Sequence, residues 1–254
     1  MVGTFAGLTG HVVTALQLFV TATSYATEAN PDTRARYSKF SRAGRDGDGK
    51  AASTTTWPSR LAMTVIYAPA AVAAATLATA APSLPVSLCV VHFVKRCMEV
   101  AFLHQYSGRT DRATPTMIGA YYALIVLLVA RAGDDGSRGV RAAVGAGTCA
   151  LGLLGNLYHH YLLASLRGSS SGVAKTRYVA PRGGLFSHVA CPHYLCELVG
   201  WLGIAIAAHH VNVYLVVASM CSYLGGRSAA QNAFNRAHFP EWTEGKKNLI
   251  PFVF

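Results

Sequence analysis

The 254-residue chain is 52% hydrophobic and only 13% charged, whereas soluble domains carry about 25% charged residues, so an ordinary soluble globular protein is excluded. A mean hydropathy of +0.32 predicts a polytopic membrane protein. In a soluble protein, the formal net charge of +11 would suggest binding to nucleic acid. Here Lys and Arg occupy short loops beside apolar segments, so we expect them to orient the chain in the membrane and to bind an anionic cofactor.

In chain order, apolar segments predict seven membrane spans, because about 20 apolar residues cross a bilayer core. We expect them at residues 1–26, twice within 61–94 around a turn at Pro82 to Pro85, and at 116–130, 142–166, 192–208 and 211–225. The first should be a retained span that also acts as the insertion signal. The six cysteines lie in or beside these spans without metal-ligand spacing, so we expect reduced, packed thiols and no metal.

The basic loops alternate with uncharged turns, and this fixes the predicted orientation. Loops one, three and five and the C-terminal tail hold most of the Lys and Arg, which places them in the cytosol by the positive-inside rule. The expected fold is therefore an all-α membrane protein, a seven-transmembrane helix bundle with cytosolic cofactor-binding loops. We expect a single integral-membrane domain over residues 1–254.

Polar residues recur at helical spacing inside the third span. His92, Arg96 and Glu99 share one face, and Lys95 lies beside them. Charged groups inside a membrane helix are costly, so they indicate a site. The alternative is a solvated helix end at which Lys and Arg extend toward the headgroups.

Two later spans carry similar stripes. Asn156, His160 and Arg167 share one face of the fifth span, while adjacent His159 and His160 point about 100° apart and make a poor metal pair. His193, Glu197 and Trp201 lie at i, i+4 and i+8 in the sixth span. The alternative for this stripe is that His193 is a helix-end residue at the headgroups and Glu197 only pairs with a basic neighbour.

A Gly-Gly turn precedes the sixth span, and the three stripes together predict a polar pocket open to the cytosol. Gly183 and Gly184 allow close backbone approach to a ligand, and four arginines suit a phosphorylated one: Arg167, Arg177, Arg182 and Arg227. The chain has no GxGxxG after a strand and no P-loop, so a Rossmann domain does not hold any dinucleotide.

At these stretches the chain resembles the steroid 5-alpha-reductase family, which includes very-long-chain enoyl-CoA reductases and polyprenol reductase, and it is most similar to the plant-type branch. The matching pieces are HFVKRCMEVAFLHQYSG at 92–108, residues 156–167, PRGGLFSHVACPHYLCELVGW at 181–201, Gly226 to Ser228 and the terminal LIPFVF. The reductase-like region covers about 92–254, and SRLAMTVIYAP at 59–69 extends the resemblance over nearly the whole chain.

The resemblance implies a multi-pass enzyme of the endoplasmic reticulum membrane, with its C-terminus in the cytosol. Such enzymes transfer hydride from NADPH to a conjugated carbon-carbon double bond of a lipid. Family counterparts and the pocket argument together predict these cofactor-binding residues: Asn156, His160, Arg167, Tyr178, Arg182, Gly183, His193, Glu197, Trp201, Arg227 and Asn235.

Several positions depart from the steroid reductases. A Gln-Glu pair that engages the substrate ketone in those enzymes is Ile66 and Tyr67 here, and the Tyr after the third-span His is Phe93. Other departures are His160, in place of an acid, and Gln231 and Asn235, in place of the usual His and Tyr. The enoyl-CoA reductases rely on a Lys and a Tyr that correspond to Lys95 and Tyr194, and both are retained.

The expected reaction is NADPH-dependent reduction of a 3-oxo-4-ene steroid, with a trans-2-enoyl-CoA as second choice. Hydride addition places negative charge on the carbonyl oxygen, which needs a positioned donor. We predict that Tyr67 or Tyr194 donates there, while Lys95 and Glu99 set the local field. Two alternatives stay open: a methyltransferase of the isoprenylcysteine type, which would bind S-adenosylmethionine, and a non-catalytic member that binds lipid or NADPH.

Overall fold

The computed structural model describes residues 2–35, 55–106, 108–133, 139–168, 179–243 and 245–254. The chain divides into two compact units, one made of Met1–Arg34 with Asp134–Phe254 and the other of Ala35–Gly133. The expectation of a single integral-membrane domain stays a prediction.

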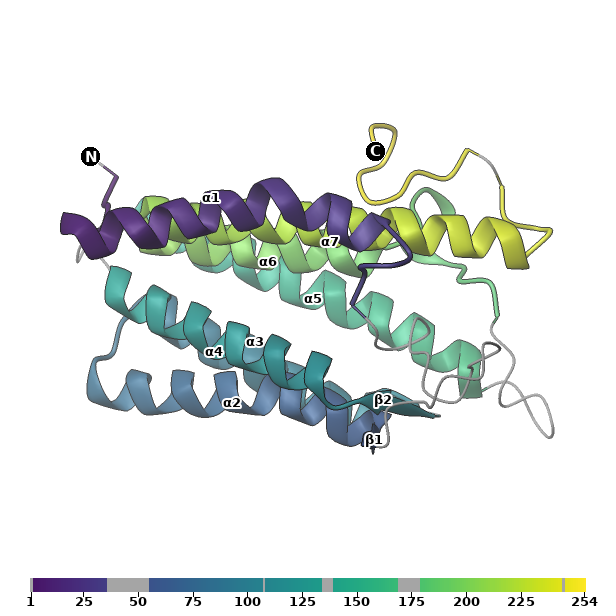
Figure 1. Cartoon of the computed structure of the whole chain (residues 1–254), viewed down its shortest axis with the longest axis horizontal. Helices are drawn as coiled ribbons and strands as arrows, with labels where there is room; N and C mark the ends of the chain where they lie inside the picture. Colours follow the sequence, from purple (N-terminus) through teal and green to yellow (C-terminus); the bar gives the residue numbers. More distant parts are fainter. Residues whose placement is uncertain (1, 36–54, 107, 134–138, 169–178, 244) are drawn as a thin grey trace. The chain divides into compact units, whose positions relative to one another are not determined.

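The first unit is built from four helices. These are α1 (Gly7–Ala29), α5 (Val140–Gly168), α6 (Pro192–Ala208) and α7 (Val211–His238). Figure 1 shows α1 lying along α7, and α5 along α6. A 3-10 turn (Gly184–Ser187) precedes α6. The described residues that were predicted to bind the cofactor all belong to this unit.

Small residues let α5 and α6 approach closely. A Cβ atom added at Gly152 or Gly203 would meet the backbone of the opposite helix. Membrane helices without a strong hydrophobic driving force associate through such small-residue contacts. The same device joins α1 to α7, where a Cβ at Gly226 would meet the carbonyl of Tyr25.

The second unit is a helical layer with a short β-ribbon. Helix α2 (Ser59–Ala80) packs against both α3 (Leu84–Met98) and α4 (Ala113–Ala132). The chain continues from α3 into a π-helix (Glu99–Leu103), closed by a hydrogen bond from the His104 N–H to the Glu99 carbonyl of 2.8 Å. Strands β1 (Thr56–Pro58) and β2 (Arg109–Asp111) pair antiparallel and tie the start of α2 to the segment before α4. The sequence did not predict this ribbon.

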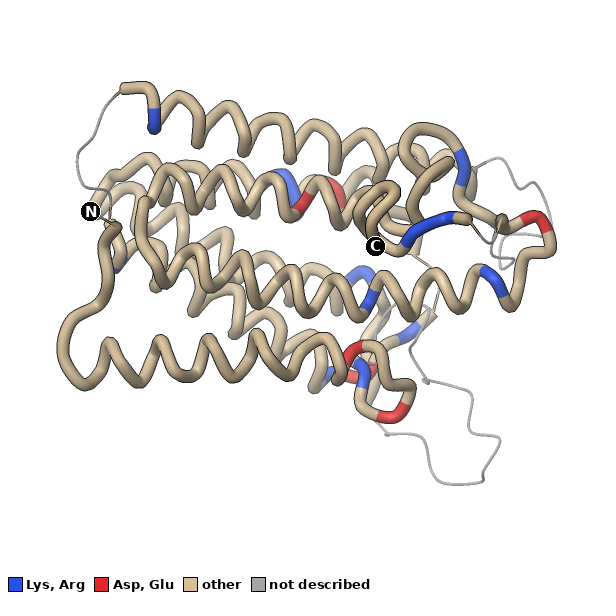
Figure 2. Tube along the Cα trace, turned by 90° about the horizontal axis from the view of Figure 1, so that it is seen from above, with Lys and Arg blue, Asp and Glu red and all other residues tan. Residues whose placement is uncertain are grey.

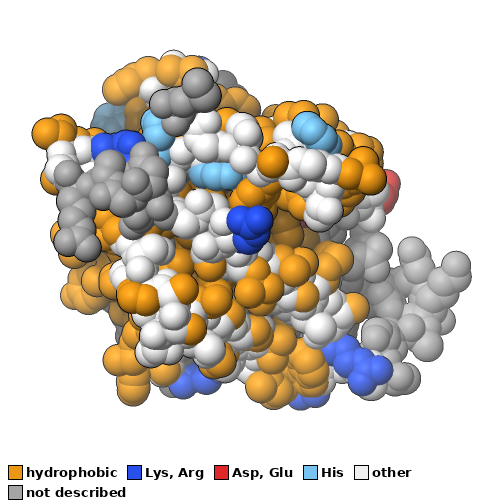
Figure 3. Space-filling view, turned by 90° about the vertical axis from the view of Figure 1, so that its left-hand side faces the viewer, with side chains coloured by type: hydrophobic (Ala, Val, Ile, Leu, Met, Phe, Trp, Pro, Cys, Tyr) orange, Lys and Arg blue, Asp and Glu red, His pale blue; other side chains and the backbone are white. Residues whose placement is uncertain are grey.

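Long stretches of helix carry no charged residue, as Figure 2 shows. Among the described residues, three helices are long and apolar enough to cross a membrane: Ser59–Ala80, Ala113–Ala132 and Val140–Leu166. Hydrophobic side chains also cover much of the face in Figure 3, and large apolar residues such as Leu16, Phe19 and Leu151 are exposed. An all-α membrane protein is therefore supported, with three such spans.

Helix α1 is less apolar because it carries several hydroxyl side chains, yet these are satisfied locally. Thr14, Thr21, Ser24 and Thr27 each donate to the carbonyl four residues earlier, at 2.6–3.0 Å. Local back-bonding of this kind lets hydroxyls face an apolar environment without losing a hydrogen bond.

The seven predicted apolar segments correspond to the helices α1 to α7, although α1 begins at Gly7 rather than at residue 1, and the largest difference in length is at α7. Helix α7 continues 13 residues beyond the predicted end at Gly225. The extension is not a wholly solvated tail, because its polar residues Asn232 and Asn235 are buried, while Arg236 and His238 are exposed. All six cysteines are free thiols.

Candidate functional site

In the second unit, a cluster of charged residues forms where α3 passes into the π-helix. Both oxygens of Glu99 are engaged, Oε1 by Lys95 Nζ at 2.8 Å and Oε2 by the Arg96 guanidinium. Arg96 also donates from Nη2 to the hydroxyl of Tyr67 on α2. Glu99, Arg96 and Tyr67 are all buried. These residues therefore form a buried polar cluster and not a solvated helix end.

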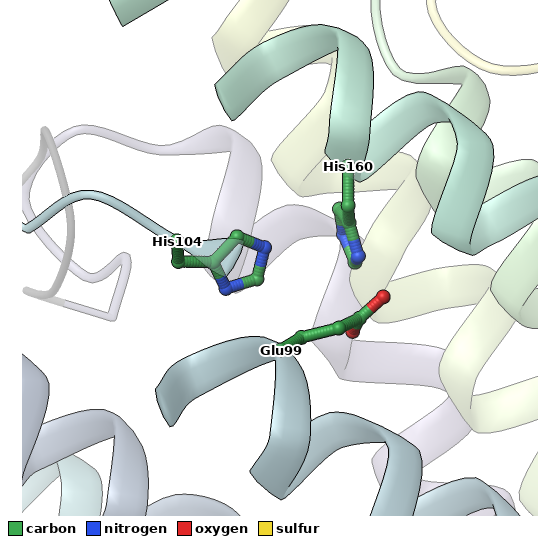
Figure 4. Close-up of side chains that lie close together, drawn as sticks. All are labelled: Glu99, His104 and His160. Atoms are coloured by element: carbon green, nitrogen blue, oxygen red, sulfur yellow. The ribbon is translucent and has the colours of Figure 1, made fainter. Parts of the chain in front are cut away.

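Aromatic rings hold one side of this cluster. Tyr67 stacks on Tyr122 of α4 with ring centroids 5.9 Å apart, and Phe93 contacts Tyr122 edge-on at 5.5 Å. The Glu99 and His104 side chains, labelled in Figure 4, come from the start of the π-helix and from the residue after it. His104 Nδ1 lies 3.0 Å from the Tyr106 hydroxyl.

In the first unit, polar residues of α5 fasten the start of α6. The Asn156 side-chain amide donates to the His193 carbonyl at 2.8 Å. The rings of His160 and His193 lie 5.5 Å apart, and Tyr194 lies 4.3 Å from His193. The mouth of α6 is thus lined by imidazole and phenol groups.

The Gly-Gly turn is held against α5 by His159. Gly183 and Gly184 have φ values of 87° and 52°, a backbone region that residues other than glycine rarely adopt. The Leu185 N–H donates to His159 Nε2 at 3.2 Å, and His159 Nδ1 lies 2.7 Å from the Gly155 carbonyl. Because a carbonyl only accepts, the imidazole carries its proton on Nδ1 and accepts at Nε2. His159 is therefore a positioning residue for the turn.

Asn232 anchors the C-terminal segment to α7. Its Oδ1 accepts from Trp242 Nε1 at 2.8 Å, and its Nδ2 donates to the Lys246 carbonyl and to Asn248 Oδ1. The anchored segment then pairs with the residues before α6, since the Ala190 N–H donates to the Lys247 carbonyl at 2.8 Å. The C-terminal segment is therefore hydrogen-bonded alongside the residues that lead into α6.

A cavity of about 250 Å³ lies between the C-terminal segment and the residues before the Gly-Gly turn. Arg182, Lys246 and Glu241 supply its charges, and Trp242 supplies an aromatic wall. Lys246 Nζ lies 3.9 Å from the Trp242 ring centroid, and burial lowers the pKa of Lys246 below the ordinary lysine value. Two cations and one carboxylate leave the cavity with a net positive charge, which suits an anionic ligand.

Two further polar residues of α7 are buried. Arg227 pairs with Glu28 of α1 at 2.9 Å. Asn235 accepts from the Gln231 amide at 2.7 Å, while among the described residues its own Nδ2 has no hydrogen-bond partner. Outside the helices, burial lowers the pKa of Arg34, and neighbouring Glu28 opposes that shift. The end of α1 is therefore an electrostatic partner of α7.

Comparison with known proteins gives this arrangement a context. The family profile described as 3-oxo-5-alpha-steroid 4-dehydrogenase matches residues 116–254, more than half of the chain. The chain belongs to this family. It is 27% identical to 3-oxo-5-alpha-steroid 4-dehydrogenase 1 of Macaca fascicularis over 196 residues, which cover 74% of this chain and 73% of the relative.

Two further relatives carry related names. The human 3-oxo-5-alpha-steroid 4-dehydrogenase 1 is 26% identical over 74% of each chain. The rat 3-oxo-5-alpha-steroid 4-dehydrogenase 2 is 30% identical over 56% of each chain. The predicted resemblance to the steroid 5-alpha-reductase family is therefore confirmed, and the family consists of oxidoreductases.

The structure groups the residues predicted for this family as follows. Of the four predicted catalytic residues, Tyr67, Lys95 and Glu99 come together in the second unit, and Tyr194 belongs to the first. The predicted cofactor residues whose side chains are described all belong to the first unit: Asn156, His160, Arg182, Gly183, His193, Glu197, Trp201, Arg227 and Asn235. Figure 4 shows His160 projecting from α5. Tyr178 and the Arg167 side chain lie outside the described residues.

Some members of the predicted set have mainly internal partners. Arg227 is paired with Glu28, Asn156 is bonded to the backbone of α6, and Trp201 is fully buried. The roles of all predicted site residues stay predictions. Sequence reasoning missed Arg96 as the direct partner of Tyr67, Glu28 as the partner of Arg227, and Asn232 as the anchor of the tail. The recurrence of Arg96 on the stripe of His92 and Glu99 was the one signal available.

Proposed function

We propose that this chain is a multi-pass enzyme of the endoplasmic reticulum membrane, crossing it with seven helices and exposing its C-terminus to the cytosol. It reduces a conjugated carbon-carbon double bond of a lipid with NADPH. A 3-oxo-4-ene steroid is the first substrate class, and a trans-2-enoyl-CoA is the second. Family membership over residues 116–254 and the names of the relatives support the reaction class.

The observation that carries the proposal is the buried contact of Arg96 with Tyr67, held by Glu99. Tyr67 occupies the position at which the steroid enzymes carry the Glu that engages the substrate ketone. A phenol therefore replaces a carboxyl group at this position. A phenol is able to donate to a carbonyl oxygen, which an ionised carboxylate cannot do. The substitution therefore keeps a carbonyl-binding function at this position.

The residues of the first unit fit a phosphorylated dinucleotide. The buried Asn235 Nδ2 is a donor with no hydrogen-bond partner among the described residues, and buried donors of this kind call for a ligand or solvent partner. Arg182 and Lys246 offer cations for phosphate beside the buried ring of Trp242. Together with the mouth of α6, these residues would hold NADPH, which supplies the hydride when bound.

In the proposed reaction the enone gains a hydride at its β carbon and a proton at its α carbon. Negative charge develops on the carbonyl oxygen as the double bond shifts, and the Tyr67 hydroxyl donates a hydrogen bond to that oxygen. Lys95 and Arg96 keep the surroundings positive while Glu99 holds both cations in place. Preorganised donors of this kind typically contribute about 100- to 1,000-fold in rate.

NADPH consumption by microsomes expressing the chain tests the proposal. We expect activity with a 3-oxo-4-ene steroid or a trans-2-enoyl-CoA, and the saturated product identified by mass spectrometry. Thermal protection by NADPH but not by S-adenosylmethionine separates this function from a methyltransferase. Binding of NADPH without turnover of either substrate class would instead support a non-catalytic member.

A further inference from the structure

A continuous series of ion pairs and hydrogen bonds connects the π-helix with the hydroxyl of Tyr67, entirely within the second unit. Lys95 and Arg96 occupy separate oxygens of Glu99, and Arg96 uses its other terminal nitrogen for Tyr67. The guanidinium carbon also lies 4.5 Å from the centroid of the Tyr67 ring. Arg96 thus contacts both the oxygen and the ring of Tyr67.

The direction of this hydrogen bond follows from the chemistry of the guanidinium. Arginine has five N–H donors and no acceptor, so the phenol oxygen of Tyr67 must be the acceptor in its bond with Arg96. The phenol proton is therefore directed at an atom other than Arg96. A lysine or an amide at position 96 would not constrain the hydroxyl in the same way, because neither has two separate terminal nitrogens that each donate to a different partner.

The charge of the cluster favours an anionic oxygen. Lys95 and Arg96 each bring one positive charge and Glu99 one negative charge, which leaves a formal excess of +1. Arg96 and Glu99 are 5% and 3% exposed, so this excess is weakly screened. An oxygen that becomes negative during a reaction would be stabilised more here than a neutral carbonyl, and this difference lowers an activation barrier.

Packing restricts the motion of both groups. Tyr67 is stacked on Tyr122. The backbone at Glu99 is set by the i to i+5 hydrogen bond between its carbonyl and the His104 N–H. Single π-helical turns inserted in α-helices are frequent at functional sites. Glu99 therefore presents its carboxylate to two cations from a fixed backbone position.

We propose that Arg96 is a positioning residue that aims the hydroxyl of Tyr67 at the carbonyl oxygen of the substrate, and that Glu99 holds Arg96 in that orientation. The inference rests on the proposed enone reduction and deepens it. Tyr67 is the residue that touches the substrate, and Arg96 acts through it. Lys95 neutralises the second oxygen of Glu99 and contributes to the excess positive charge.

A double-mutant cycle on the full chain in microsomes tests this assignment. We expect Tyr67→Phe and Arg96→Gln each to lower kcat about 100-fold and to raise KM about three- to tenfold, because the ketone loses a hydrogen bond in the ground state as well. The double variant should be no more than about threefold slower than either single variant, since the larger part of the Arg96 effect passes through the hydroxyl and the remainder comes from its charge. Arg96→Lys should recover part of the rate, because it retains the charge but not the fork.

Arg60→Gln is the matched control. Arg60 lies on the same unit, donates to the Ala101 carbonyl at 3.2 Å and is exposed, so its loss should leave kcat within about twofold of the parent. Melting temperatures of all variants establish that each one folds. Multiplicative effects in the cycle, or full activity of folded Arg96→Gln, would overturn the assignment.

A binding measurement separates this inference from the proposed function. The affinity for a saturated 3-oxo steroid is measured in the same variants without turnover. Coupled losses in Tyr67→Phe and Arg96→Gln support the positioning role even if the parent chain reduces no substrate, in which case only the proposed function fails. Uncoupled losses, or no ketone binding by the parent chain, would overturn the positioning role.

Discussion

Replacing Glu28 by alanine should destabilise the first unit strongly. The carboxylate lies 2.9 Å from the Arg227 guanidinium, and the two side chains are 3% and 2% exposed. The variant leaves the Arg227 charge buried without its ion-pair partner. Breaking a buried pair in this way costs about 3–5 kcal/mol, because the remaining charge keeps its desolvation penalty and loses the attraction.

The free energy of unfolding can be followed by circular dichroism in mixed micelles, with Glu28→Ala compared with the parent chain. Asp32→Ala is the matched control, since Asp32 is an exposed acid four residues later and its loss should change stability by no more than about 0.5 kcal/mol.

Replacing both partners by apolar residues tests the electrostatic origin of the loss. Glu28→Leu combined with Arg227→Met should recover at least half of the stability lost by Glu28→Leu alone, because neither charge is then buried. A cost below about 1 kcal/mol for Glu28→Ala, or a double variant as unstable as the sum of the two single variants, would refute the reasoning.

Three other variants test the first unit. Gly203→Leu forces a side chain into the backbone of α5 and should prevent folding or lower the melting temperature by more than about 10 °C, whereas Gly147→Leu, at an open position, should not. Asn232→Leu removes the hydrogen bonds that anchor the C-terminal segment and should speed its cleavage by a protease at least about tenfold. An unchanged cleavage rate would contradict the anchoring role of Asn232. His159→Leu removes the bonds to Gly155 and Leu185 and should weaken NADPH binding about tenfold in a thermal-shift titration while leaving the helix content intact.

Local sequence was sufficient to locate the helices because their ends are marked by residues with strong backbone preferences. Pro192 begins α6, the turn at His209 ends it, and Pro85 lies in the first turn of α3. The Gly-Gly turn was predicted because glycine allows close backbone approach, and the structure gives both glycines positive φ values. Helical spacing also grouped Arg96 with Glu99, because the two are three residues apart where α3 continues into the π-helix.

Partners from different elements could not be predicted, since no local period relates them. Tyr67 and Arg96 are 29 positions apart, and Glu28 and Arg227 are 199 apart. The end of α7 was misjudged because its polar residues resemble a solvated tail until Asn232 is seen to bind Trp242. Composition and spacing determine which segments enter the bilayer and which faces are polar. Tertiary packing alone decides which buried charge meets which partner, because burial makes an unpaired charge costly and selects neighbours that satisfy it.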